Sequence, residues 1–192
     1  MHRRSLLAAT PLALMGTAMT DETAEAQAAP DRENMLLLDL KDGQVVIRLR
    51  PDLAPKHVAQ IKALARAHFY DNTPFHRVIE GFMAQGGDPT GTGTGGSEMP
   101  NIPAEFTPPA RARFTRGVCG MARSSDPNSA NSQFFIMFAP YPSLDGQYTI
   151  WGQVISGMEF VDKIKRGAGG SGQVRDPDRI IHMRVAADVP AG

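Results

Sequence analysis

The chain has 192 residues, with 20 Lys and Arg against 20 Asp and Glu, so its formal net charge is zero. This neutrality argues against nucleic-acid binding driven by phosphate contacts and against a polybasic membrane-surface protein. The length suits one domain with one core, and a hydrophobic share of 42% is ordinary for a soluble globular protein.

The N-terminal residues differ in composition from the rest. His2-Arg3-Arg4 is basic, and the following stretch to Met19 is rich in Leu, Ala and small residues, although too few apolar residues are consecutive to span a membrane. Ala26-Gln27-Ala28 fits a small-x-small cleavage site. We therefore predict an export signal over residues 1–28, with an approximate cut site, and a periplasmic domain over residues 29–192. The paired arginines allow the twin-arginine route, and Sec export stays open.

The first elements of the mature chain are a hairpin and a helix. Strands are predicted over 35–40 and 45–49, because Asp42-Gly43 between two apolar runs is a strong hairpin signal. A helix is predicted to begin near Pro55, where a missing N–H costs little. It carries one apolar stripe at three- and four-residue spacing, made of Val58, Ile61, Leu64, Ala65 and Phe69. His57 and His68 are interpreted as ordinary surface or helix-end residues.

Two short strands are predicted on either side of Gly81, over 75–79 and 82–85. Side chains alternate across a strand, so Arg77 shares a face with the apolar Phe75 and Ile79. A guanidinium is costly to bury without partners. Two interpretations stay open: Arg77 pairs with a carboxylate at the sheet margin, or it presents a cationic head to an apolar pocket.

The segment 89–109 is rich in Gly, Thr and Pro. Its run from Thr90 to Gly96 invites comparison with a phosphate-binding loop, but no Lys-Ser/Thr pair and no helix start follow it. We interpret it as a surface loop whose glycines let a ligand chain come close.

Further strands are predicted over 116–122, 133–138, 149–155 and 179–187, with a second helix over 158–166 and a glycine-rich loop over 167–178. The single cysteine, Cys119, and the single tryptophan, Trp151, are interpreted as core residues, and His182 as a structural histidine. About eight strands joined by turns, with two helices, predict a mainly β protein built as a closed eight-stranded antiparallel β-barrel.

Metal and nucleophile motifs are absent from the sequence. It has no HExxH, no CxxC and no GxSxG elbow, so neither a metalloenzyme nor a serine hydrolase is indicated, and no cofactor is expected.

Three ordered blocks carry a family resemblance. The stretch 75–88 reads FHRVI-x-GFM-x-QGGD, and it is followed by SQFFI at 132–136 and LDGQY at 144–148. These blocks resemble the signature of the cyclophilin family of peptidyl-prolyl cis/trans isomerases, over about residues 35–187. The resemblance implies a barrel capped by two helices, an active groove on its outside, proline-containing polypeptides as partners, and isomerisation of Xaa-Pro bonds without a covalent intermediate.

The resemblance also implies roles for individual residues. Arg77 would hydrogen-bond to the proline as its amide twists, and Gln85 would bind substrate backbone and help to orient Arg77. The proline pocket would be formed by Phe82, Met83, Phe135 and Leu144. The wall beside the residues before the proline, the neighbouring groove and a further substrate contact would be supplied by Ala122, Arg123, Ser124, Gln133, Gly93 and Tyr148.

Three positions depart from the family pattern. Ser143 stands where many members have Trp, which puts tight binding of the drug cyclosporin in doubt. Arg123 stands where Asn is common, and Tyr148 where many eukaryotic members have His. None of the three removes Arg77 or the ring pocket, so the catalytic prediction is unchanged.

Two other functions stay open at this point. The same groove could serve a chaperone or a proline-peptide binding module whose isomerase rate is incidental. A weaker alternative is a sugar- or nucleotide-binding barrel that uses the glycine loop. A monomer is expected, because no long apolar stripe is left over for a partner.

Overall fold

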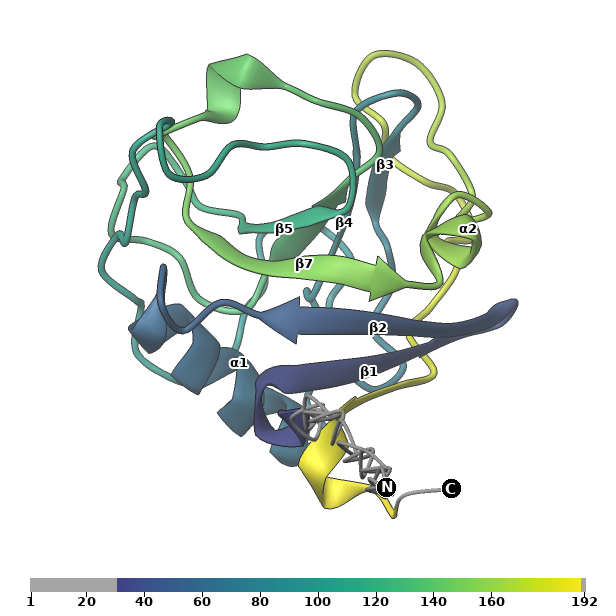
Figure 1. Cartoon of the computed structure of the whole chain (residues 1–192). Coiled ribbons are helices and arrows are strands. Elements are labelled where there is room, and N and C mark those ends of the chain that lie inside the picture. The colour runs from purple at the N-terminus through teal and green to yellow at the C-terminus, as the bar shows by residue number, and fades with distance from the viewer. Residues whose placement is uncertain (1–30, 191–192) are drawn as a thin grey trace, which may run out of the picture. The chain divides into compact units, whose positions relative to one another are not determined.

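One antiparallel sheet dominates the computed structural model, which describes residues 31–190 (Figure 1). Its strands are β1 (Met35–Leu40), β2 (Gly43–Leu49), β3 (Arg77–Ile79), β4 (Met83–Gly86), β5 (Val118–Met121), β6 (Phe134–Met137), β7 (Ile150–Ser156) and β8 (His182–Val185). The α-helices are α1 (Pro55–Arg66) and α2 (Met158–Val161). The chain also forms three short 3-10 helices, η1 (Arg32–Asn34), η2 (Pro142–Leu144) and η3 (Ala186–Asp188). The predicted β1–β2 hairpin is confirmed, with Leu40 opposite Gly43 at its turn.

The sheet is an open half-barrel, so the prediction of a closed barrel was wrong. The strand order is β3-β4-β6-β5-β7-β2-β1-β8, which leaves β3 and β8 as edges that do not pair with each other. Strand β3 has only three residues. Its outer edge is taken by the irregular segment 167–180, in which the Gly172 carbonyl accepts a hydrogen bond from the Val78 amide at 2.7 Å. Closure by strand pairing is therefore replaced by single backbone contacts to a loop.

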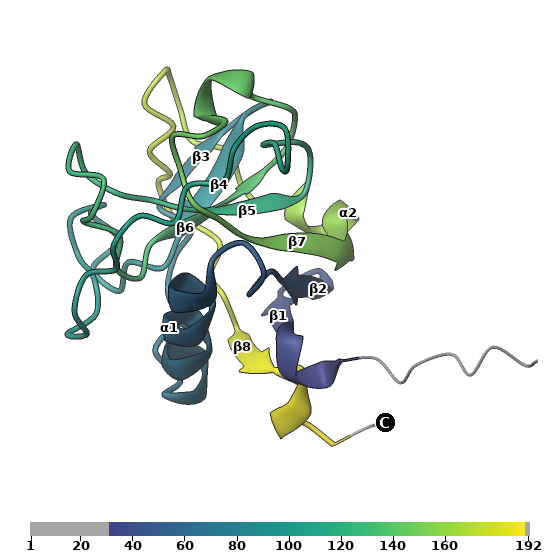
Figure 2. The ribbon, with the colours of Figure 1, turned by 60° about the vertical axis from the view of Figure 1, so that its left-hand side comes forward.

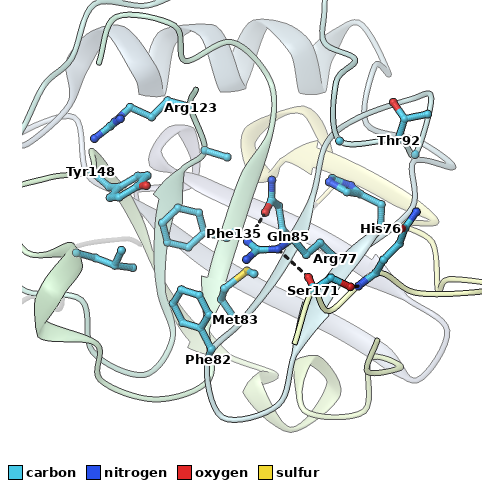
Figure 3. A pocket seen from close by; sticks show the side chains of 15 residues that line it. His76, Arg77, Phe82, Met83, Gln85, Thr92, Arg123, Phe135, Tyr148 and Ser171 are labelled. Atoms are coloured by element: carbon cyan, nitrogen blue, oxygen red, sulfur yellow. Dashed lines mark hydrogen bonds between the residues drawn. The ribbon is translucent and has the colours of Figure 1, made fainter. Parts of the chain in front are cut away.

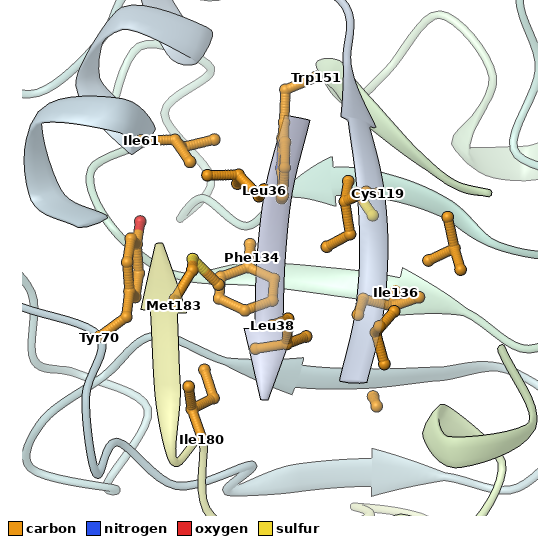
Figure 4. Close-up of a cluster of buried hydrophobic side chains, with 14 of the residues drawn as sticks. Leu36, Leu38, Ile61, Tyr70, Cys119, Phe134, Ile136, Trp151, Ile180 and Met183 are labelled. Atoms are coloured by element: carbon orange, nitrogen blue, oxygen red, sulfur yellow. The ribbon is translucent and has the colours of Figure 1, made fainter. Parts of the chain in front are cut away.

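The core fills the concave face of the sheet. Along β1 every second residue is buried, namely Leu36, Leu38 and Leu40, as alternation across a strand requires. Phe134 lies at the centre, and its ring meets Tyr70 and Trp151 edge-on, with centroids 5.6 and 5.8 Å apart (Figure 4). The prediction that Trp151 and Cys119 belong to the core is confirmed, because neither is exposed to solvent.

The two helices pack at different places on this sheet. Helix α1 packs against β8 and β7, and α2 packs against β2 (Figure 2). The predicted apolar stripe of α1 is buried at Val58, Ile61, Leu64 and Ala65. Helix α2 is one turn, shorter than the predicted 158–166. The chain after it is turn-like, and the carbonyls of Asp162 and Ile164 accept from the Arg166 guanidinium Nη1, both at 2.6 Å, in place of continued helical bonding.

His57 was predicted to be an ordinary surface or helix-end residue. It lies in the first turn of α1, but the surface interpretation was wrong. Its side chain is fully buried, and its Nδ1 lies 2.6 Å from a carboxylate oxygen of Glu105. The same carboxylate accepts the backbone N–H groups of Lys56 and His57, both at 3.0 Å, and so caps the first turn of α1 in place of Ala54. Burial lowers the pKa of His57, although Glu105 acts in the opposite direction.

Several predicted strands are longer than the observed ones, β8 most clearly. His182 begins β8, and half of its side chain is exposed, with its Nδ1 3.2 Å from Asp71 Oδ2. No helix within residues 31–190 has the length and apolar character needed to cross a membrane. The predicted export signal over 1–28 lies outside the described residues.

Candidate active site

The convex face of the sheet carries a second, smaller apolar cluster. Strand β6 divides the two faces: Phe134 points into the main core, whereas Phe135 belongs to the second cluster with Met83 of β4 and Phe114. This alternation places the aromatic block of β6 on both sides of the sheet. Neighbouring strands bring Gln85 opposite Phe135 and Arg77 opposite Gln85. Three chemically different side chains thus line up across β3, β4 and β6 on the outer face.

A pocket of about 430 Å³ opens at this point (Figure 3). One side is apolar, formed by Phe82, Met83, Phe135 and Leu144 with Tyr148 beside them. The other side is polar and includes Arg77 and Gln85. Its dimensions fall in the range of small-molecule and side-chain binding sites.

Arg77 is held by neutral acceptors. Its Nε donates to the Ser171 carbonyl at 3.1 Å, and its Nη1 donates to Gln85 Oε1 at 3.3 Å. Among residues 31–190, no carboxylate lies within 4.0 Å of the guanidinium, so the interpretation that Arg77 pairs with a carboxylate was wrong. The remaining N–H donors of the guanidinium lie beside the apolar pocket.

A chain of side-chain amides continues from Arg77 along the floor of the groove. Gln85 Nε2 donates to Gln133 Oε1 at 3.0 Å. Gln133 Nε2 in turn donates to two carbonyls of the glycine-rich loop, Gly93 at 3.0 Å and Gly95 at 2.8 Å. The segment 89–109, predicted to be a surface loop near a ligand, therefore contacts the site through backbone oxygens.

Phe135 forms the apolar floor and is supported from behind. Its ring stacks on Phe114 with centroids 5.7 Å apart and meets Tyr148 edge-on at 5.9 Å. Gly120 on β5 leaves room for both rings, since a Cβ there would lie 2.4 Å from Phe135 Cζ and 2.6 Å from Phe114 Cε1. Neither Gly120 nor Phe114 was among the predicted site residues. Both lie behind Phe135 and support it without lining the pocket.

Arg123 lines the side of the pocket that lies across from Arg77. Its guanidinium lies over the Tyr148 ring, 4.5 Å from the centroid, and donates to the carbonyls of Gln147 and Ser124, both at 2.9 Å. Stacking and hydrogen bonding together fix the long side chain, which would otherwise be mobile. The departure from Asn at this position thus replaces a short amide with a fixed cation.

A second pocket of about 510 Å³ adjoins the first and shares Gln85, Gly93, Ala122 and Arg123 with it. Its lining is small and polar. All the predicted site residues line the first pocket except Ser124 and Gln133, which line the second. The structure therefore brings all of the predicted residues to one continuous groove.

Other lining residues were not predicted: His76, Gly91, Thr92, Ser171 and Gln173. His76 precedes Arg77 and is buried, and burial lowers its pKa although Asp88 acts to raise it. Ser171 and Gln173 come from the loop after α2, far away in sequence, where only the density of glycines could have drawn attention to them.

The groove offers apolar contacts and hydrogen-bond donors, and the chain's single cysteine does not line it. Cys119 is fully buried, and burial raises the pKa of its thiol. Within residues 31–190, no three His, Cys, Asp or Glu side chains gather in a way that could hold a metal ion. What the described site can do is grip an apolar ring and place a cationic donor beside it.

Known proteins share this chain's sequence and architecture. A family model described as cyclophilin type peptidyl-prolyl cis-trans isomerase/CLD matches residues 35–185. A probable peptidyl-prolyl cis-trans isomerase of Brucella suis is 51% identical over 197 residues, covering 96% of this chain and 97% of the relative. A relative from Arabidopsis thaliana, also called a peptidyl-prolyl cis-trans isomerase, is 38% identical and covers 76% of this chain and 85% of its own length.

Two crystal structures resemble the fold. A cyclophilin from Hirschia baltica gives a TM-score of 0.73 at 27% identity, covering 83% of this chain and 76% of its own. A cyclophilin-type isomerase from Cryptosporidium parvum, crystallised in the presence of the dipeptide Ala-Pro, gives 0.72 at 33% identity, covering 79% of this chain and 98% of its own. Together with the family match over nearly the whole described region, these relatives show that the chain belongs to the cyclophilin family of peptidyl-prolyl cis-trans isomerases.

Proposed function

We propose that this chain accelerates cis–trans isomerisation of Xaa-Pro bonds in folding or flexible polypeptides, without a covalent intermediate or a cofactor. The observation that carries the proposal is the position of Arg77, held by Ser171 and Gln85 with no carboxylate partner among the described residues, beside an apolar pocket of about 430 Å³. The relative crystallised with Ala-Pro supports a proline-containing ligand.

The reaction needs a catalyst that prefers a twisted amide. The barrier to rotation about an ordinary peptide bond is about 18–20 kcal/mol, because the C–N bond has partial double-bond character. As the bond twists, conjugation is lost, and the proline nitrogen becomes pyramidal and regains its lone pair. A donor that bonds to this lone pair stabilises the twisted state more than either planar isomer, which is what accelerates the step.

The residues of the groove divide this work between gripping and donating. Phe82, Met83, Phe135 and Leu144 would hold the proline ring, so that rotation occurs on the residue before it. Arg77 would donate to the proline nitrogen, and Gln85 would hold Arg77 and bind substrate backbone. One charge-assisted hydrogen bond made only in the twisted state is worth about 1.5–3 kcal/mol, or roughly 10- to 150-fold in rate.

The enzyme proposal is tested with an Ala-Xaa-Pro-Phe peptide whose cis-to-trans relaxation is followed with and without the full chain. Acceleration proportional to enzyme concentration supports it. If a folded chain binds the peptide but leaves its relaxation unchanged, the protein is a binding module or chaperone instead. A nucleotide or sugar that raised the melting temperature would favour the glycine-loop alternative.

We also propose a cellular location and an oligomeric state for the enzyme. The basic start, the apolar stretch and the Ala26-Gln27-Ala28 site support export to the periplasm by the Tat or Sec route. Cell fractionation with N-terminal sequencing tests this, and replacing both Arg3 and Arg4 by Lys would block Tat export but spare Sec export. We further propose a monomer, to be checked by light scattering, and weak cyclosporin binding, because Ser143 offers no aromatic surface.

A further inference from the structure

Asp88 is a fully buried carboxylate next to the groove. It follows Gly86-Gly87 at the end of β4 and has no exposed surface. Its Oδ1 accepts the backbone N–H and the hydroxyl of Thr90, at 2.8 and 2.7 Å, and its Oδ2 accepts the N–H groups of Gly93 and Gly95, at 2.7 and 3.1 Å. All four donors lie in the glycine-rich loop, so one carboxylate sets its backbone.

The loop is linked to Arg77 by a chain of hydrogen bonds in which each donor must face an acceptor. The Gly93 and Gly95 carbonyls can only accept, so Gln133 must turn its Nε2 toward them. Its Oε1 then faces Gln85, which must present Nε2 to it and is left with Oε1 facing the guanidinium. Since a guanidinium can only donate, each amide in the chain has one allowed orientation.

We propose that Asp88 is a positioning residue for Arg77, acting through the loop carbonyls, Gln133 and Gln85. This inference rests on the proposed function. Gly95 shows the coupling directly, because its N–H donates to Asp88 while its carbonyl accepts from Gln133. Without the carboxylate, the Gly93 and Gly95 carbonyls lose the contacts that hold them against Gln133. Gln133 and Gln85 can then shift, which weakens the Gln85 contact that helps to hold Arg77.

The test replaces Asp88 by Asn, which keeps the shape but puts an NH2 group where a carboxylate oxygen now accepts. Either orientation of this amide sets a donor against the donors of Thr90 or of Gly93 and Gly95. Because small misplacements of a catalytic group cost up to about 100-fold, we expect kcat to fall about 10- to 100-fold, a larger factor than any loss of peptide affinity through Gly93 and Gln133. Glu98→Gln, at an exposed acidic residue of the same segment, is the matched control and keeps wild-type activity.

A double-mutant cycle separates positioning from a structural role. In an Arg77→Ala background, Asp88→Asn should cause no further loss of kcat, since the group it positions is gone. Equal losses in both backgrounds, in a protein that still folds, would overturn the proposal. Wild-type inactivity would instead defeat the proposed function.

A second variant and a direct readout keep the proposal falsifiable if Asp88→Asn fails to fold. Gln133→Glu sets a carboxylate against the two loop carbonyls and should reproduce the loss of kcat. The Arg77 Nε–Hε resonance of the free protein should shift or broaden in both variants and stay in place in Glu98→Gln. An unchanged resonance in folded Asp88→Asn, or in Gln133→Glu where Asp88→Asn does not fold, would refute the positioning role even without any activity measurement.

Discussion

Replacing Gly120 by Ala adds one methyl group behind Phe135, and this should displace the ring that forms the floor of the pocket. The added Cβ would lie 2.4 Å from Phe135 Cζ and 2.6 Å from Phe114 Cε1, closer than side chains tolerate. Phe114 is buried and cannot retreat, whereas Phe135 has the open pocket in front of it. The ring of Phe135 must therefore move into the space meant for the proline.

Both stability and activity follow from this displacement. Overpacking a core position costs about 1–3 kcal/mol, so the free energy of unfolding should fall by that amount. If the moved ring removes contact equal to about two methylene groups of the substrate, roughly 1.6 kcal/mol of binding is lost. That corresponds to a fall of about tenfold in kcat/KM.

Urea denaturation and the proline relaxation assay measure the two effects separately. Gly170→Ala is the matched control, because a Cβ there meets no atom within 4 Å and the backbone conformation is ordinary. It should change neither quantity. A Gly120→Ala variant that kept the wild-type kcat/KM would refute the idea that Phe135 forms the ring-binding floor.

Three further results are expected. Burial holds the pKa of His57 below its usual 6.5 despite Glu105, so this group's share of stability is intact above pH 6.5 and is lost as the pH falls below it; urea titrations should show a slope of at most about 1.4 kcal/mol per pH unit from this group, absent in His57→Gln. Burial raises the pKa of the Cys119 thiol, so a thiol reagent should label the protein only after denaturation, and rapid labelling of the folded protein would contradict its core position. Asp145→Ala removes the acceptor of the Phe114 N–H at 2.7 Å and should lower the free energy of unfolding by about 1–2 kcal/mol in denaturant melts, whereas Asp145→Asn keeps an acceptor and most of the stability.

Features set by short-range patterns could be predicted from the sequence. The β1–β2 hairpin follows from Asp42-Gly43 between apolar runs, and the separation of Phe134 from Phe135 follows from strand alternation. The residues chosen for the groove came from the family resemblance, and the structure brings them together. Their individual roles in catalysis stay predictions.

Features set by contacts between distant segments could not be predicted. The sheet stays open because an irregular loop, and not β8, bonds to β3 at Val78. His57 can be buried because Glu105, 48 residues later in the chain, provides a hydrogen-bond partner for its Nδ1. Arg77 is held by the Ser171 carbonyl, a backbone atom that every residue type carries, so no side-chain pattern marks it.

The most direct test of the central claim measures catalysed exchange at the proline bond in a peptide bound at saturation, by NMR, for the wild type, Arg77→Ala and Arg77→Lys. If Arg77 donates to the twisted amide, the bound exchange rate should fall about 10- to 150-fold in Arg77→Ala, while peptide Kd changes little. Lys should recover only part of the rate, because it cannot keep the paired contacts to Ser171 and Gln85. An exchange rate in Arg77→Ala equal to that of the wild type would contradict the assigned role of Arg77.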